Sequence, residues 1–270
     1  MTASATLIVT SYNILHPDYA LRHRETAGIM QNAEGQIVSN WPQRQHHVAE
    51  NLAASGTTIA CVQEVSIDTL APLCAQFRAL SFYPTHFRAP PNSASAGNAI
   101  LSRDENLVGN ETLMLPGADP QARTTTAAFL TLLPTSQRLL VISLHIAGYP
   151  HAEPEAVKLA AAKQPGFNDL KCHLEFAEAQ KRRVDCIIIA GDFNEDPAHD
   201  GRPLSRHNLM RAHGYHSDSN LAASEPSSGR KIDWIYVWSR TPVQMTPVTT
   251  PPPHPSASDH LPVVTRIVLG

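Results

Sequence analysis

Short apolar runs alternate with helix-length amphipathic stretches along this chain, and the alternation limits its possible folds more than any other feature. Residues 57–62 (TTIACV) and 186–190 (CIIIA) are nearly continuous apolar runs, which is typical of strands buried on both faces. Residues 40–56, and the stretch that follows the N-cap Ser66, place apolar residues at helical spacing instead. The alternation predicts a mixed α/β layer fold.

The boundaries of these elements follow from capping residues, glycines and prolines. The helix within 40–56 has Asn40 as its N-cap and stops at Gly56. A long helical region over 154–183 is broken around Pro165, with one helix before the break and one from Asn168 onward. Residues 242–255, with three consecutive prolines, are expected to form a stiff loop. No solenoid-length repeat is visible, so we expect a single domain over residues 1–270. The expected strands are 6–14, 57–62, 82–87, 98–102, 124–133, 139–146, 186–190, 232–237 and 261–269.

The composition excludes several classes of protein. Apolar residues make up 42% of the chain and charged residues 17%, which excludes a disordered chain and a coiled coil. No apolar run reaches the ~18 residues of a membrane span, and no basic residue precedes the first apolar stretch, which we interpret as a strand rather than a signal peptide. A net charge of −3 gives no basic field for long duplex nucleic acid.

The four cysteines are widely scattered and form no C-x-x-C pair. This distribution predicts neither a zinc cluster nor a disulfide framework, and it indicates a reducing, cytoplasmic compartment. Cys61 and Cys186 fall inside apolar runs, where we expect free thiols to behave as small buried hydrophobic groups.

Polar side chains occur where the apolar runs end, and these positions predict a functional site. Each such residue alone has an ordinary explanation as a turn or loop residue. Acids that converge with no Lys or Arg beside them would repel one another unless a cation neutralised them, and hard oxygen ligands suit Mg²⁺ or Mn²⁺. The set as a whole therefore predicts a divalent-metal phosphoester site. It consists of Asn13, Glu64, His145, Asp192, Asn194, Asp233, Asp259 and His260.

Seven sequence blocks, taken in order, resemble the endonuclease/exonuclease/phosphatase superfamily of metal-dependent phosphoester hydrolases. The resemblance implies an α/β fold, a four-layer sandwich in which two mixed β-sheets pack face to face with helices outside. It places the metal at the strand ends between the sheets. The blocks are SYNI (11–14), VQEV (62–65), GNAILSR (97–103), SLH (143–145), GDFN (191–194), IDWI (232–235) and SDH (258–260).

The resemblance also implies a role for each residue of the set. Glu64 matches the principal Mg²⁺ ligand, and Asn13 and Asp259 match its neighbours in the metal shell, directly or through water. Mn²⁺ is a possible substitute for Mg²⁺.

The other five residues match the groups that carry out the reaction. Asp192 and Asn194 would orient and deprotonate the attacking water. His260 and His145 would hold the non-bridging phosphate oxygens in the transition state. Asp233 would accept a hydrogen bond from His260 and fix its tautomer.

Several further residues have two open interpretations. Arg44, in the family-like pattern W-x-x-R, either braces Glu64 or the loop near it, or is an exposed helix arginine with a surface partner. Asn98 either reaches a substrate phosphate or is a turn residue at the start of a strand. Arg103 is interpreted as a solvated charge. Five other histidines match no ligand spacing and are expected at the surface: His46, His47, His207, His213 and His216.

The resemblance leans toward the deadenylase-like branch, on the YNIL start, the pair Trp41 and Arg44, and the run after His145. The block GNAILSR departs from that branch. The expected function is Mg²⁺-dependent hydrolysis of RNA ends, short single strands or nucleotides, with no obligate protein partner. Two alternatives stay open: a phosphatase or phospholipase-type enzyme acting on inositol phosphates or lipid headgroups, and an inactive binding protein.

Overall fold

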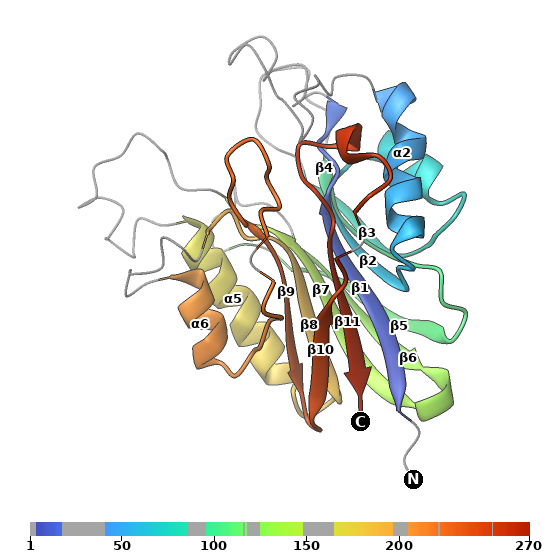
Figure 1. The fold of residues 1–270 in the computed structure, drawn as a ribbon. Coiled ribbons are helices and arrows are strands. Elements are labelled where there is room, and N and C mark those ends of the chain that lie inside the picture. Colours follow the sequence, from blue (N-terminus) through green and yellow to red (C-terminus); the bar gives the residue numbers. More distant parts are fainter. Residues whose placement is uncertain are drawn as a thin grey trace, which may run out of the picture.

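Two mixed β-sheets face each other in the computed structural model, and helices cover the outer face of each sheet (Figure 1). The fold therefore has the four layers that the resemblance implied. The structure describes residues 4–17, 41–85, 96–115, 117, 125–147, 165–196, 205–220, 222–249 and 251–270.

The first sheet has six strands in the order β10-β11-β1-β2-β4-β3. β1 and β2 are parallel, and their register pairs Asn13 with Gln63, so both strands end at the same edge of the sheet. β11 runs antiparallel to β1 on its other side. The strands are β1 (Ala5–Asn13), β2 (Ile59–Val65), β3 (Arg78–Thr85), β4 (Ala96–Ser102), β10 (Val243–Pro247) and β11 (Val263–Leu269).

The second sheet has five strands in the order β5-β6-β7-β8-β9, and it also contains a parallel strand pair whose ends lie at one edge. β7 and β8 are parallel, and their register pairs His145 with Asp192 at the strand ends. β9 is antiparallel to β8 and begins at Asp233, opposite Asp192. The strands are β5 (Leu107–Leu115), β6 (Thr125–Leu132), β7 (Gln137–His145), β8 (Cys186–Asp192) and β9 (Asp233–Ser239).

The helices are fixed by the capping residues that the sequence provides. α3 (Ile67–Leu73) begins with a capping box in which Ser66 and Thr69 satisfy each other's backbone N–H groups. α2 (Trp41–Ala54) is followed by Gly56 at φ 70°, as expected for a helix stop. α2 and α3 pack on the first sheet, while α5 (Pro165–Gln180) and α6 (Arg206–Ala212) pack on the second (Figure 1).

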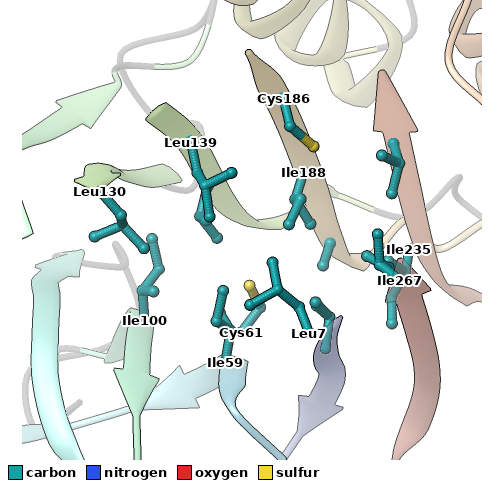
Figure 2. Close-up of a cluster of buried hydrophobic side chains, with 14 of the residues drawn as sticks. Leu7, Ile59, Cys61, Ile100, Leu130, Leu139, Cys186, Ile188, Ile235 and Ile267 are labelled. Atoms are coloured by element: carbon teal, nitrogen blue, oxygen red, sulfur yellow. The ribbon is translucent and has the colours of Figure 1, made fainter. Parts of the chain in front are cut away.

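A large apolar cluster of the described residues lies between the two sheets. Figure 2 shows Leu7 and Ile59 of the first sheet pointing toward Leu139 and Ile188 of the second. Full burial of such a side chain contributes about 1.5–3 kcal/mol, so this layer fixes the two sheets, and the strand ends with them, in one arrangement. The thiols of Cys61 and Cys186 are free and buried, as predicted.

The structure corrects several expectations. Residues 242–255 are not simply a loop, because Val243–Pro247 forms the edge strand β10 against β11. The helix expected from Asn168 starts at Pro165, which takes the N-terminal position where its missing N–H costs nothing. β5 and α6 were not predicted. The helix expected before residue 164, the N-cap Asn40 and the strand ends at 86–87 and 124 lie outside the described residues. No described helix has the length and apolarity to cross a membrane.

Candidate active site

The first half of the site forms where β1 and β2 end together. Glu64 has φ 62° at a β-bulge that shifts the register between Gln63 and Val65, and such bulges re-aim a side chain. Its carboxylate accepts hydrogen bonds from the Asn13 side-chain N–H₂ at 3.2 Å and from the His16 backbone N–H at 2.8 Å. The bulge therefore directs Glu64 toward Asn13.

The second half forms where β7 and β8 end, and two side chains join it to the first. Asn13 Nδ2 lies 3.2 Å from Asp192 Oδ2 as well as from Glu64. His145 Nε2 lies 3.2 Å from Asp192 Oδ2, and its Nδ1 lies 3.9 Å from Glu64 Oε1. The ends of both sheets thus meet in one buried polar cluster.

The GDFN turn after β8 requires its glycine. A Cβ on Gly191 would lie 1.9 Å from the carbonyl oxygen of Leu144, so only glycine permits this approach of β8 to β7. The Asn194 backbone N–H donates to Asp192 Oδ1 at 2.8 Å, and Asn194 Nδ2 donates to the Ile146 carbonyl at 2.9 Å. The turn is consequently tied both to its own carboxylate and to the backbone that follows His145.

The segment before β11 completes the cluster from the opposite direction. The Ser258 hydroxyl donates to the carbonyl of Asn13 at 2.7 Å and lies 3.2 Å from Asp259 Oδ1. His260 Nδ1 lies 2.7 Å from Asp233 Oδ2, which fixes its Nδ1–H tautomer. Ser258 therefore links Asp259 to the end of β1.

Two pKa shifts follow from this arrangement. Burial raises the pKa of Asp259, and the charge of Glu64 raises it further, although His260 opposes both effects. Burial alone would lower the pKa of His260, but the carboxylates of Asp233, Asp259 and Asp192 outweigh it and raise that pKa well above its usual value. Asp233 is fully buried, and within the described residues its Oδ1 has no hydrogen-bond partner, so a protonated His260 balances its charge.

Arg44 lies behind the first half of the site. Its guanidinium is buried and donates to the carbonyls of Ile14 (2.6 Å), Leu15 and Ala257 (2.9 Å). Ile14 follows Asn13 and Ala257 precedes Ser258, so Arg44 joins the two segments that carry the expected metal ligands. The alternative of an exposed helix arginine is wrong.

Arg206 lies behind the second half in the same way and was not predicted. It is 1% exposed and donates to the carbonyls of Phe193 and Ala147, the latter at 2.7 Å. Its Nε lies 3.5 Å from the buried carboxylate of Glu195. A serine N-cap before it is the only local sequence signal, and this signal identifies a helix rather than a site.

Comparison with known proteins identifies the family. The sequence profile of the Endonuclease/Exonuclease/phosphatase family matches residues 11–260. The chain belongs to this family. Its members are phosphoester hydrolases, so the chain is an enzyme of that class, as the motif blocks indicated. A comparison with curated protein sequences gave no match.

Solved structures with low sequence identity share the family fold. The human Nocturnin catalytic domain with bound sulfate is 17% identical, with a TM-score of 0.66 over 98% of this chain and 96% of that one. ANGEL2, a 2′,3′-cyclic phosphatase in complex with adenosine-2′,3′-vanadate, is 15% identical, with a TM-score of 0.69 over the same shares. A functionally unknown conserved protein from Enterococcus faecalis is 18% identical, with a TM-score of 0.66 over 97% of this chain and 99% of that one.

Members of the endonuclease/exonuclease/phosphatase family generally use divalent metal ions, and the acids of this site fit such an ion. The charge of Glu64 raises the pKa of Asp259, and this is the repulsion that a divalent cation would relieve. One assumption of the sequence argument was wrong, because cations do lie nearby. Arg44 and Lys231 are buried beside the acids, but their side chains donate to backbone carbonyls.

The remaining candidates lie as follows. Asn98 is buried on β4, opposite Gln63, the neighbour of Glu64. Arg103 is exposed, as expected. His207 is not at the surface: it is buried, with Nδ1 2.6 Å from the Tyr236 hydroxyl, because α6 packs it against the aromatic side chains of β9.

Proposed function

We propose that residues 1–270 form one catalytic domain that hydrolyses phosphodiesters of RNA ends, short single strands or nucleotides, with Mg²⁺ and by in-line attack of water. The observation that carries the proposal is the convergence of Asn13, Glu64 and Asp192 from two sheets, beside the hydrogen-bonded pair of Asp233 and His260. Four strand ends, the beginning of β9 and the segment before β11 supply one polar site, and charge stabilisation by such a site is what phosphoryl transfer requires.

Glu64, Asp259 and Asn13 are the residues that would hold the metal. Carboxylate and amide oxygens are hard ligands, which favour Mg²⁺ and admit Mn²⁺. When bound, the metal supplies charge stabilisation for the phosphoryl and leaving oxygens. Arg44 holds the backbone that carries these ligands in place.

Asp192 is the residue that would orient and deprotonate the attacking water. Its Oδ1 accepts the Asn194 backbone N–H, and its Oδ2 faces Asn13 and His145, so the carboxylate is held in one orientation. Asn194 uses its Nδ2 to bind the backbone after His145, which leaves Oδ1 of its side chain as the atom for a water contact. Positioning of this kind supplies a large part of the rate enhancement.

His260 and His145 would bind the non-bridging oxygens. Asp233 holds the Nδ1–H of His260, so the N–H at Nε2 is the one available to the phosphoryl group. The raised pKa keeps His260 protonated at neutral pH, and a cationic donor stabilises the negative charge that accumulates in the transition state. Asn98, opposite Gln63 on β4, would contact a further phosphate oxygen.

Three features support the choice of substrate and location. The net charge of −3 suits small or single-stranded substrates better than long duplexes. The related ANGEL2 structure holds an adenosine-2′,3′-vanadate, a nucleotide-type ligand. Four free cysteines accord with a cytoplasmic location, which cell fractionation would test.

The test is a substrate panel with purified protein stripped of metal and then supplied with Mg²⁺ or Mn²⁺. The panel contains oligo(A), a mixed-sequence RNA, single- and double-stranded DNA, a nucleoside 2′,3′-cyclic phosphate and an inositol phosphate. We expect metal-dependent cleavage of the RNA or nucleotide substrates. Glu64→Gln and Asp192→Asn should each lower kcat ~10²-fold or more. Glu105→Gln, which changes an exposed carboxylate, is the matched control and should behave as wild type. Phosphate release from the inositol phosphate alone would contradict the proposal.

A further inference from the structure

A second group of metal-ligating side chains lies on α2 and the segment before β11. His47 and Glu50 are three residues apart on α2, so they share one face of the helix. His254 Nε2 lies 2.5 Å from Glu50 Oε2, and the rings of His47 and His254 stack with centroids 4.0 Å apart. One ligand atom from each residue lies within 4.8 Å of the other two.

The backbone of His254 is held rigidly against the helix. The Asn51 side chain accepts from the His254 backbone N–H at 2.9 Å and donates to its carbonyl at 2.8 Å. Prolines flank His254 on both sides and restrict its backbone further. A ligand that binds here therefore meets a backbone that is already fixed, so only the imidazole must be oriented, which lowers the entropic cost of binding.

We propose that His47, Glu50 and His254 form a transition-metal site, with Zn²⁺ as its most suitable ion, separate from the catalytic cluster. Two imidazoles and one carboxylate are a known zinc ligand set, whereas Mg²⁺ selects oxygen ligands alone. Zinc–ligand bonds of about 2.1 Å require ligand atoms about 3.4 Å apart in a tetrahedron. The side chains of Glu50 and His254 are 52% and 32% exposed, so they can rotate from their present 2.5 Å contact to that separation without disturbing the core.

The position of this site gives it a structural consequence. The segment 254–257 is contacted by three residues at helical spacing on α2. Arg44 binds the Ala257 carbonyl, His47 stacks on the His254 ring, and Asn51 binds the His254 backbone. A metal bound here adds a bond between α2 and that segment, which continues directly into residues 258–260. Zinc would therefore stabilise the backbone that leads to the SDH block.

The test counts bound zinc in the presence of excess Mg²⁺, by equilibrium dialysis and metal analysis. To remove zinc binding at the catalytic carboxylates, every protein carries Glu64→Gln, which changes the principal ligand expected there, and the proposal does not depend on catalysis. We expect one bound zinc in this background, and its loss in both His254→Ala and His47→Gln. His46→Ala, on an exposed neighbouring position of α2, is the matched control and should retain the zinc.

Three outcomes would overturn the proposal. They are no zinc bound in the starting protein, an unchanged affinity in both His254→Ala and His47→Gln, or an equal loss of zinc in His46→Ala. Circular dichroism of each variant in a chelator shows whether it is folded, and His47→Gln keeps a good helix former on α2 if His254→Ala does not fold.

Discussion

Replacement of Arg206 by methionine tests whether this buried arginine positions the catalytic turn. Methionine keeps much of the apolar volume, but it removes the donors that bind the carbonyls of Phe193 and Ala147 and leaves the buried Glu195 without its partner guanidinium. Each buried acceptor left without a donor costs about 1–3 kcal/mol, and a broken buried ion pair costs about 3–5 kcal/mol. These contributions overlap, so we expect Arg206→Met to lower the free energy of unfolding by about 3–5 kcal/mol.

The same change should affect the reaction in a recognisable way. Phe193 lies between Asp192 and Asn194, and a shift of this turn by about 1 Å is enough to lower kcat ~10²-fold. Arg206 itself is buried and has no surface to offer a substrate, so KM should change little. Arg206→Lys, which can reach only one of the two carbonyls, should restore part of the lost kcat.

Urea unfolding and steady-state kinetics on a simple phosphodiester, both with Mg²⁺, measure the two effects. Arg211→Met changes an exposed arginine of the same helix and should alter stability by no more than about 0.5 kcal/mol. A stable Arg206→Met with normal kcat would refute the reasoning. A destabilised variant with normal kcat per folded molecule would show that Arg206 serves the fold alone.

Three further predictions concern the metal, the histidine and the glycine. Mg²⁺ should raise the melting temperature of wild type but not of Glu64→Gln, because only binding to the folded state stabilises it. Asp233→Asn should lower the pKa of His260 in an NMR titration. A folded-state pKa above the unfolded value stabilises the folded protein below about pH 6.5, and this stabilisation is lost as the pH rises through the folded-state pKa of His260. The difference in unfolding free energy between wild type and Asp233→Asn should therefore become smaller when urea unfolding is repeated at alkaline pH. Gly191→Ala should prevent stable folding because its Cβ meets a carbonyl, whereas Gly229→Ala, at φ 68° in open space, should cost only about 1 kcal/mol by urea unfolding.

The parts of the fold that the sequence predicted are those with a strong local pattern. The parallel strands β2 and β8 are buried throughout, so each is a continuous apolar run with a polar ending. The unpredicted elements lack such a pattern. β5 is an edge strand whose central residues are exposed, β10 is an edge strand that ends in a proline, and α6 is only seven residues long. An edge strand is determined mainly by its hydrogen bonds to the neighbouring strand, so its side chains show little of the apolar pattern that would predict a strand.

The individual site residues could be found from the sequence. Their proximity in space could not be derived only from the fact that they lie at strand ends. Asn13, Glu64, His145 and Asp192 close two parallel strand pairs, so they reach one edge of each sheet for a topological reason. Asp233 begins its strand, and Asp259 and His260 precede theirs. These residues reach the same edge because β9 and β11 run antiparallel to their neighbours, which only the sheet order reveals.

The two buried arginines show why the halves of this site resemble each other. Past the last ladder pair of a strand, backbone carbonyls lose their sheet partners but remain buried, and each needs a donor. A guanidinium has five N–H groups in a fixed plane, so one side chain can bind carbonyls from two segments at once. Arg44 does this for the first half and Arg206 for the second. Burial lowers the pKa of Arg44 to about 10, while Asp259 and Glu64 oppose the shift, so it stays charged at neutral pH. Because its hydrogen bonds go to carbonyls, that charge moderates the repulsion among the acids and leaves their oxygens available to a metal.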